Sequence, residues 1–291
     1  MHEIDRIIEA AGRMKRGIVA TIVATRGSTY RRAGARSVIS EDGEAVGAIS
    51  GGCLEKDLAA RCGEWLADMQ ARVITYDSSR EDDIVFGLGL GCRGVIEVHI
   101  EPFDAEHPLR LVREFRWNGR EPVTWETSID GRLLLVESIR PSRALAIFGG
   151  GPDVEPLTNT AEQAGYTVSR ISPRDVHPEK VRDTIDLTQF DAAVIMTHNY
   201  LYDEVLLQTL LPTEIAYIGL LGPKARGEEL LRGAADPRVH SPIGLDLGGE
   251  TPEQIALSIV AEIEATLNRR TARPLRELDG PLHVRPSVPC R

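Results

Sequence analysis

Cys53 lies at the end of Ser50-Gly51-Gly52-Cys53, directly before a stretch with a helical pattern of apolar residues. The two glycines let the backbone approach a ligand closely, and the free amides of a first helical turn attract an anion. A helix N-terminus also lowers the pKa of a thiol, which favours the thiolate that acts as nucleophile or metal ligand. The spacing therefore predicts a site for an anion or a soft metal. The alternative is a small residue in a tight turn.

A second cysteine, Cys92, follows Gly91 in the segment GLGLGCRG at residues 87–94. The four glycines of this segment free the backbone to fold its amides around an oxyanion. The alternative is a glycine-rich connection between two strands, which is a common feature of proteins. The remaining two cysteines, Cys62 and Cys290, are not in such a segment.

Four arginines gather in residues 26–36, although the whole chain has a net charge of −10: Arg26, Arg31, Arg32 and Arg36. Guanidinium groups bind phosphate through two parallel hydrogen bonds, so this segment is the natural local site for an anion. The alternative is a solvated charged loop, the usual fate of charge runs. The two glycines within the segment favour the functional interpretation.

A glycine-rich turn, Gly149-Gly150-Gly151, follows a predicted strand and precedes a predicted helix. This order is that of a dinucleotide-binding fingerprint. However, Val154 stands where a third glycine would allow close helix packing, and Ser172 stands where an acidic residue would bind the ribose hydroxyls. The segment predicts a Rossmann-like domain. It leaves an NAD(P)-dependent oxidoreductase as the alternative function, against which both departures count.

Two domains and a tail must position these residues in an α/β protein. We predict a mixed α+β domain at residues 1–140 and a Rossmann-like parallel-sheet domain at 143–270, followed by a proline-rich tail at 271–291. Pro141-Ser142-Arg143 is the predicted linker. Beyond it, strands and helices alternate, which is typical of a parallel sheet.

In the first domain, short β-rich runs predict strands at 18–24, 37–39, 44–48, 73–76, 95–100, 123–127 and 133–137. An amphipathic pattern at 1–16, a helix that starts near Gly52 and a helix at 108–117 complete this domain. Cys62 lies on the apolar stripe of the second helix, so we expect it in the core.

In the second domain, we predict strands at 144–148, 167–171, 192–196 and 215–220. Three helices are predicted along with these strands. The first follows the glycine-rich turn and ends at Ala164, the second covers 203–211 and the third covers 224–233. A last helix begins after Thr251, a good N-cap residue, with Pro252 at its first position.

The composition excludes several classes of function. A net charge of −10 and a pI near 5.3 argue against nucleic acid as a main partner. No apolar run reaches the roughly 18 residues that span a bilayer, and the N-terminus lacks the apolar centre of a signal peptide. We therefore expect a cytoplasmic protein. Scattered cysteines and histidines predict neither a disulfide framework nor a zinc site.

Seven segments, in this order, resemble the XdhC/CoxI family of accessory proteins over residues of about 15 to 268. They are ATIVATRGSTYRRAGARSVIS, GAISGGCLEKDL, FGLGLGCRGVIEVHIEP, LAIFGGGPDVEPL, VIMTHNYLYDE, AYIGLLGPKARGEEL and SPIGLDLGGETPEQIALSIVAEI. The strings GGCLE and GLDLGGETPEQIA are the most specific, and chance agreement of all seven segments is not expected.

The resemblance implies a protein that binds molybdenum cofactor, a pterin dithiolene with a phosphate and sometimes an appended nucleotide. Such proteins protect the cofactor, present it for replacement of an oxo ligand by sulfur, and deliver it to an apo molybdenum hydroxylase such as xanthine dehydrogenase. The implied partners are that apo-enzyme and a cysteine desulfurase-like sulfur donor. We expect a chaperone without turnover of its own, and a homodimer because most soluble oligomers are symmetric dimers.

The resemblance also assigns roles to residues. Three arginines would hold the phosphate, and a thiolate of Cys53 or Cys92 would reach molybdenum or its sulfur, since soft ligands suit that chemistry. The residues that we expect to bind the cofactor are Arg31, Arg32, Arg36, Gly51, Gly52, Cys53, Gly91, Cys92, Gly149 and Gly151. A sulfur carrier that forms a persulfide on Cys53 or Cys92 is a further hypothesis, compatible with the first.

Thr197-His198-Asn199 follows a predicted strand, at the edge where doubly wound folds bind ligands. Asn199 stands where the family commonly has an acidic residue, which argues against an acid–base role for that position. The alternative for His198 is a hydrogen-bonded residue at a strand end.

Overall fold

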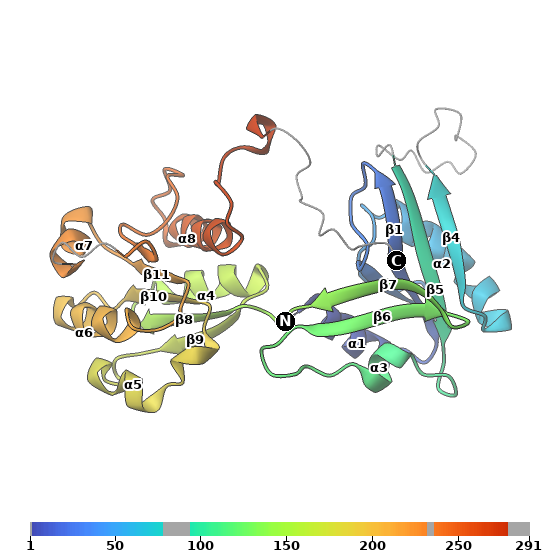
Figure 1. The fold of residues 1–291 in the computed structure, drawn as a ribbon, viewed down its shortest axis with the longest axis horizontal. Coiled ribbons are helices and arrows are strands. Elements are labelled where there is room, and N and C mark those ends of the chain that lie inside the picture. The colour runs from blue at the N-terminus through green and yellow to red at the C-terminus, as the bar shows by residue number, and fades with distance from the viewer. Residues whose placement is uncertain (1, 78–93, 232–235, 279–291) are drawn as a thin grey trace. The chain divides into compact units, whose positions relative to one another are not determined.

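The computed structural model describes residues 2–77, 94–231 and 236–278. The chain divides into two compact units, Met1–Ser142 and Arg143–Arg291, with the boundary inside Pro141-Ser142-Arg143 (Figure 1). Within the described residues, no helix is both long and apolar enough to cross a membrane.

The N-terminal unit is built on a five-stranded antiparallel sheet with the order β3-β2-β1-β5-β4. Its strands are β1 (Gly17–Gly27), β2 (Arg36–Ser40), β3 (Ala45–Gly47), β4 (Arg72–Asp77) and β5 (Gly94–Phe103). Successive residues of β1 face opposite sides of the sheet. Ile18, Ala20 and Ile22 face one buried cluster, and Val19 faces another.

Helix α2 (Cys53–Asp68) covers the first of these faces (Figure 1). Its buried residues recur at intervals of three and four, as the sequence predicts, and are Leu54, Leu58, Cys62, Trp65 and Leu66. Cys62 is fully buried, so its predicted place in the core is confirmed. Burial raises the pKa of its thiol to about 11, which keeps the thiol protonated at neutral pH.

The other face of the sheet is covered by α1 (Glu3–Arg13), α3 (Arg110–Glu114) and a hairpin of β6 (Val123–Ile129) and β7 (Arg132–Ile139). Helix α1 confirms the amphipathic pattern at the N-terminus. The helix predicted at 108–117 is shorter than expected. Two side chains of this segment, Leu111 and Phe115, are buried, but only five of its residues adopt helical geometry.

The C-terminal unit contains the predicted parallel sheet, with the order β12-β11-β10-β8-β9. Its strands are β8 (Ala144–Gly149), β9 (Thr167–Ile171), β10 (Ala192–Met196), β11 (Tyr217–Leu220) and β12 (Val239–His240). All residues of β8, β10 and β11 are buried, as expected for strands covered on both faces. The α/β fold class predicted from the sequence is thus confirmed.

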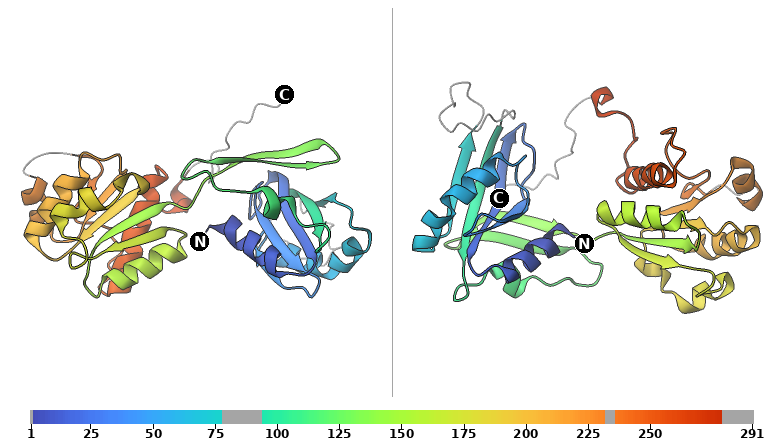
Figure 2. Two further views of the ribbon diagram at one scale, coloured as in Figure 1. Left: turned by 90° about the horizontal axis from the view of Figure 1, so that it is seen from below. Right: turned by 180° about the vertical axis from the view of Figure 1, so that it is seen from behind.

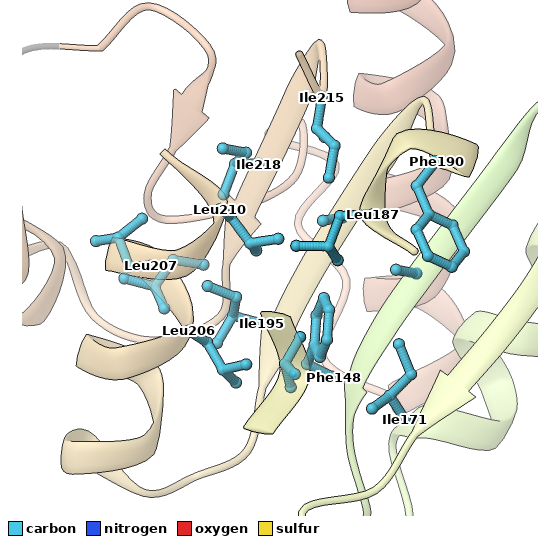
Figure 3. Packing of buried hydrophobic residues seen from close by; sticks show 14 of the residues in the cluster. Phe148, Ile171, Leu187, Phe190, Ile195, Leu206, Leu207, Leu210, Ile215 and Ile218 are labelled. Carbon is cyan, nitrogen blue, oxygen red and sulfur yellow. The ribbon is translucent and has the colours of Figure 1, made fainter. Parts of the chain in front are cut away.

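Helices cover both faces of this sheet (Figures 1 and 2). α4 (Val154–Gln163) and α8 (Pro252–Leu267) pack on one face. α5 (Val181–Thr184), α6 (Tyr200–Leu210) and α7 (Lys224–Leu231) contribute to the cluster on the other face. Figure 3 shows how Leu206, Leu207 and Leu210 of α6 gather with Phe148 and Ile195 of the sheet.

Two helix starts follow from side-chain caps. The predicted N-cap of α8 is confirmed, because Thr251 accepts a hydrogen bond from the Gln254 amide and forms a capping box with it. Helix α6 begins at Tyr200, earlier than the predicted residue 203. The reason is Asn199, whose side chain accepts hydrogen bonds from the amides of Leu201 and Tyr202 and so caps the helix.

Candidate functional site

The Gly-Gly-Cys turn lies at the N-terminus of α2, as predicted. Gly52 has a φ of 109°, which favours glycine, and Cys53 is the first helical residue. The Cys53 thiol is free and half-buried, and it lies 3.7 Å from the Ser50 hydroxyl. A Cβ on Gly51 or Gly52 would meet no other atom within 4 Å in the described part of the chain, so none of the described residues blocks the turn.

Glu55 holds this turn in place from inside the helix. Its carboxylate accepts hydrogen bonds from the amides of Ile49 at 2.7 Å and Ser50 at 2.8 Å, and from the Ser50 hydroxyl. The Ser50 hydroxyl in turn accepts from the amides of Gly52 at 3.0 Å and Leu54 at 3.1 Å. Burial opposes ionisation of Glu55, but these hydrogen bonds outweigh it and lower the pKa of the carboxyl.

We expect Glu55→Gln to lower the free energy of unfolding of the N-terminal unit by about 1–3 kcal/mol at pH 7, since hydrogen bonds to a charged group are lost. A carboxyl whose pKa is lowered by folding stabilises above its unfolded pKa, and this contribution disappears as the pH falls below its usual value of 4.5. Urea unfolding at pH 7 and in acid measures both effects. Equal unfolding midpoints for variant and wild type at pH 7 would contradict the role of Glu55.

Two of the three arginines predicted to bind phosphate have carboxylate partners within the N-terminal unit. Arg31 donates to both oxygens of Glu3, at 2.9 and 2.7 Å. Arg36 is buried and forms an ion pair with Glu137 of β7. Arg32 is exposed to solvent. Of the three arginines predicted to bind phosphate, Arg32 is thus exposed and able to bind it directly. Arg31 and Arg36 would first have to release their carboxylate partners.

Gly91 and Cys92 lie in residues 78–93, outside the described residues. Their roles stay predictions. Within the part of the chain that the structure describes, no group of three or more histidine, cysteine or acidic side chains is arranged to hold a metal ion.

The glycine-rich turn of the C-terminal unit connects β8 to α4, in the predicted position. A Cβ on Gly149 would lie 2.7 Å from the Met196 carbonyl oxygen and 3.0 Å from a methyl group of Val154. Glycine is therefore needed here for close packing of β8, β10 and α4. A Cβ on Gly151 would lie 2.5 Å from Oδ1 of Asp153, so the Asp153 carboxylate sits directly against the turn.

The position of Asp153 bears on the oxidoreductase alternative. In a dinucleotide-binding fold, this turn and the first amides of the following helix hold the pyrophosphate. Here a carboxylate at the N-cap of α4 lies against the turn. A phosphate would meet a like charge in the same place, which is unfavourable at short range. This arrangement counts against a dinucleotide at Gly149 and Gly151.

Asp153 also contacts His198, a pair that the sequence interpretation did not foresee. Nε2 of His198 lies 2.8 Å from Oδ2 of Asp153. His198 follows β10 and Asp153 follows β8, and the two strands are neighbours in the sheet. The carboxyl ends of parallel strands lie at one edge of a sheet, so the predicted parallel sheet already placed both residues at that edge. The pairing itself was not evident, because three polar residues, Thr197, His198 and Asn199, follow β10.

Comparisons with known proteins agree with this architecture. Residues 10–77 match the model of the XdhC and CoxI family, and residues 145–263 match that of the XdhC Rossmann domain. A Bacillus subtilis protein, named as a probable component of xanthine dehydrogenase, is 31% identical over 91% of this chain and 97% of its own length. This chain belongs to the XdhC and CoxI family. The resemblance stated from the seven sequence segments is confirmed.

Two further proteins are similar to this member of the XdhC and CoxI family. The molybdenum cofactor insertion chaperone PaoD of Escherichia coli is 25% identical, over 88% of this chain and 85% of PaoD. A crystal structure of a Bacillus halodurans protein, described as a xanthine dehydrogenase, is 29% identical. It matches with a TM-score of 0.79 over 96% of this chain and 98% of that chain. The α/β architecture is therefore shared along nearly the whole chain.

Proposed function

We propose that this protein is a cytoplasmic accessory factor that binds molybdenum cofactor and supports its sulfuration and insertion into a molybdenum hydroxylase such as xanthine dehydrogenase. Two relatives support the proposal by their names: one is a molybdenum cofactor insertion chaperone, and one is named for xanthine dehydrogenase. The observation on this chain that carries the proposal is the open Gly-Gly-Cys turn with its free thiol.

The turn fits an anionic ligand that contains a soft metal. Cys53 starts a helix of 16 residues, whose N-terminus attracts negative charge. The space in front of Gly51 and Gly52 gives a bulky ligand access to the backbone. Thiolates are preferred ligands of soft metals and take part in sulfur chemistry. When bound, the cofactor supplies the molybdenum centre; this chain supplies a thiol, open backbone and the positive end of a helix.

For the phosphate of the cofactor we propose Arg32, the exposed member of the arginine segment. Arg31 and Arg36 contribute only if phosphate replaces Glu3 or Glu137 as their partner. The proposed partners are an apo molybdenum hydroxylase, a cysteine desulfurase-like sulfur donor and a second copy of this chain. A persulfide on Cys53 after incubation with a desulfurase, detected by mass spectrometry, would support the sulfuration step.

The protein should carry molybdenum and pterin when it is purified from a host that makes the cofactor. Molybdenum is measured by mass spectrometry of the metal, and pterin by the fluorescence of its oxidised product. Wild-type protein that carries neither, although the host makes cofactor in abundance, would refute the proposed function. Calorimetry with NAD and NADP tests the oxidoreductase alternative, for which we expect no heat of binding.

We expect Cys53→Ser to reduce the molybdenum content by about tenfold or more, since a ligand that contributes some 1.4 kcal/mol to binding changes affinity tenfold. Cys62→Ala is the matched control. Its thiol is buried in the core under α2 and does not face the turn, so this variant should keep its molybdenum. Equal molybdenum content in wild type and Cys53→Ser would remove Cys53 from the site without affecting the family assignment.

A further inference from the structure

His198 and Asp153 meet at the point where the strand order of the parallel sheet reverses. After β8, the next strand of the chain, β9, lies on one side of β8, and the strand after that, β10, lies on its other side. Ligands of doubly wound folds bind at such a point, beyond the carboxyl ends of the strands. Asp153 lies in the turn after β8 and His198 in the turn after β10, and the side chain of His198 is 57% exposed there. A bound ligand therefore has access to the imidazole.

The backbone at His198 is held in an unusual conformation. Its φ of 58° lies in the left-handed region, which residues other than glycine adopt infrequently. The next residue, Asn199, caps α6, and the preceding Thr197 hydroxyl donates to Asp203. Both neighbours of His198 are thus fixed by hydrogen bonds. This arrangement holds the imidazole beside the glycine-rich turn at a small cost in backbone energy.

The Asp153 carboxylate is committed to His198. One oxygen, Oδ2, lies 2.8 Å from Nε2, and the other, Oδ1, is buried against Gly151 without a hydrogen-bond partner among the described residues. A carboxylate only accepts hydrogen bonds, so the imidazole nitrogen that faces it carries the proton. In the neutral imidazole, the other nitrogen, Nδ1, then has a free lone pair. A carboxylate that fixes the tautomer of an exposed histidine in this way is the arrangement of a general base and its orienting acid.

We propose that His198, oriented by Asp153, accepts and returns a proton during the handover of the ligand that this protein carries. Groups such as thiols must lose a proton to bind a metal and regain one on release, so handover moves protons. The proton passes from an S–H, N–H or O–H group at the switch point to Nδ1 of His198 and leaves its electron pair on the ligand. The Asp153 carboxylate balances the positive charge of the imidazolium. Return of the proton to the ligand regenerates the neutral imidazole. This inference rests on the proposed function.

A second carboxylate among the described residues acts on His198. Asp203 of α6 lies near enough to His198 for a Coulombic interaction, but it is paired with Arg226 of α7. Arg226 balances the charge of Asp203 within this ion pair, and Asp153 is the carboxylate that contacts the imidazole. The carboxylate at the turn also disfavours phosphate here, so the switch point is suited to a neutral part of a ligand with a weakly acidic proton.

The test compares cofactor-loaded wild type with His198→Gln and Asp153→Asn. His177→Gln is the matched control, because His177 is an exposed histidine of the same unit outside the pair. The first readout is the ¹⁵N resonance of the imidazole nitrogens in protein labelled at histidine, which shows where the proton lies. The second is the rate at which each loaded protein activates apo-xanthine dehydrogenase, measured from about pH 5.5 to 8, the range in which imidazoles titrate. Molybdenum content is measured for all four proteins.

We expect the neutral imidazole of His198 in wild type to carry its proton on Nε2 and not on Nδ1, and handover rates are compared per molybdenum bound in all four proteins. Handover by His198→Gln should be about 10²-fold slower and should lose its pH dependence, the usual effect of removing a general base. Variants that hand over at the wild-type rate per molybdenum bound would overturn this inference alone, as would a neutral wild-type imidazole with its proton on Nδ1. Wild-type protein that carries no cofactor would overturn the proposed function, and this inference with it.

Discussion

Replacement of Glu137 by glutamine should destabilise the N-terminal unit by about 3–5 kcal/mol, because Arg36 would be left as a buried charge without its counter-ion. The two side chains are 7% and 17% exposed, and they connect β2 of the main sheet to β7 of the hairpin. Arg36 also donates to the Gly34 carbonyl at 2.9 Å, which does not neutralise its charge. Urea unfolding followed by tryptophan fluorescence measures this loss. All three tryptophans of the chain, Trp65, Trp117 and Trp125, belong to this unit.

The double variant Arg36→Met, Glu137→Met is the matched control. Replacement of a whole buried ion pair by apolar side chains of similar volume is often neutral or stabilising, unlike removal of one partner. We therefore expect the double variant to unfold close to the wild type. If Glu137→Gln is as stable as the wild type, Arg36 is not held by Glu137.

Arg36 shows why the sequence predicted part of the site and not the rest. The four arginines of residues 26–36 were interpreted as a group because they are close in sequence. In the structure, Arg36 begins a buried strand and its partner is 101 residues away. A single sequence does not reveal a partner at that distance. Local spacing can show that a charge is present, but the tertiary structure decides whether it is already neutralised.

Features with local causes were predicted well. The stripe on α2 placed Cys62 in the core, and the Gly-Gly-Cys turn fell at a helix start because the apolar period begins there. Strands β9 and β10 both have the predicted bounds. The apolar run of β10 is buried throughout, whereas β9 lies at the edge of the sheet and buries only Ile171. The start of α6 was missed because Asn199 was considered as a chemical group and not as a cap.

The C-terminal unit also contains a buried carboxylate, Asp203, which is paired with Arg226. Arg226→Met should destabilise this unit by about 3–5 kcal/mol at neutral pH. The side chain of Asp203 is fully buried, and Arg226 and the Thr197 hydroxyl are its partners. Burial raises the pKa of this carboxyl, although Thr197 and Arg226 act in the opposite direction. Without Arg226, the ionised carboxylate would have no cation to compensate its loss of solvation.

The pH dependence of that loss follows from the raised pKa. A carboxyl whose folded pKa lies above its unfolded value of about 3.8 binds a proton more readily in the folded state. Its cost to stability therefore grows as the pH rises from the unfolded value towards the folded pKa, and it disappears below the unfolded value. The deficit of Arg226→Met should shrink on acidification, as measured by hydrogen exchange of residues 192–210 in urea. Lys224→Met, which removes an exposed cation from the same helix, should change stability by less than about 1 kcal/mol at either pH. A deficit of Arg226→Met that is equally small, or independent of pH, would show that Asp203 is not held as a buried charge.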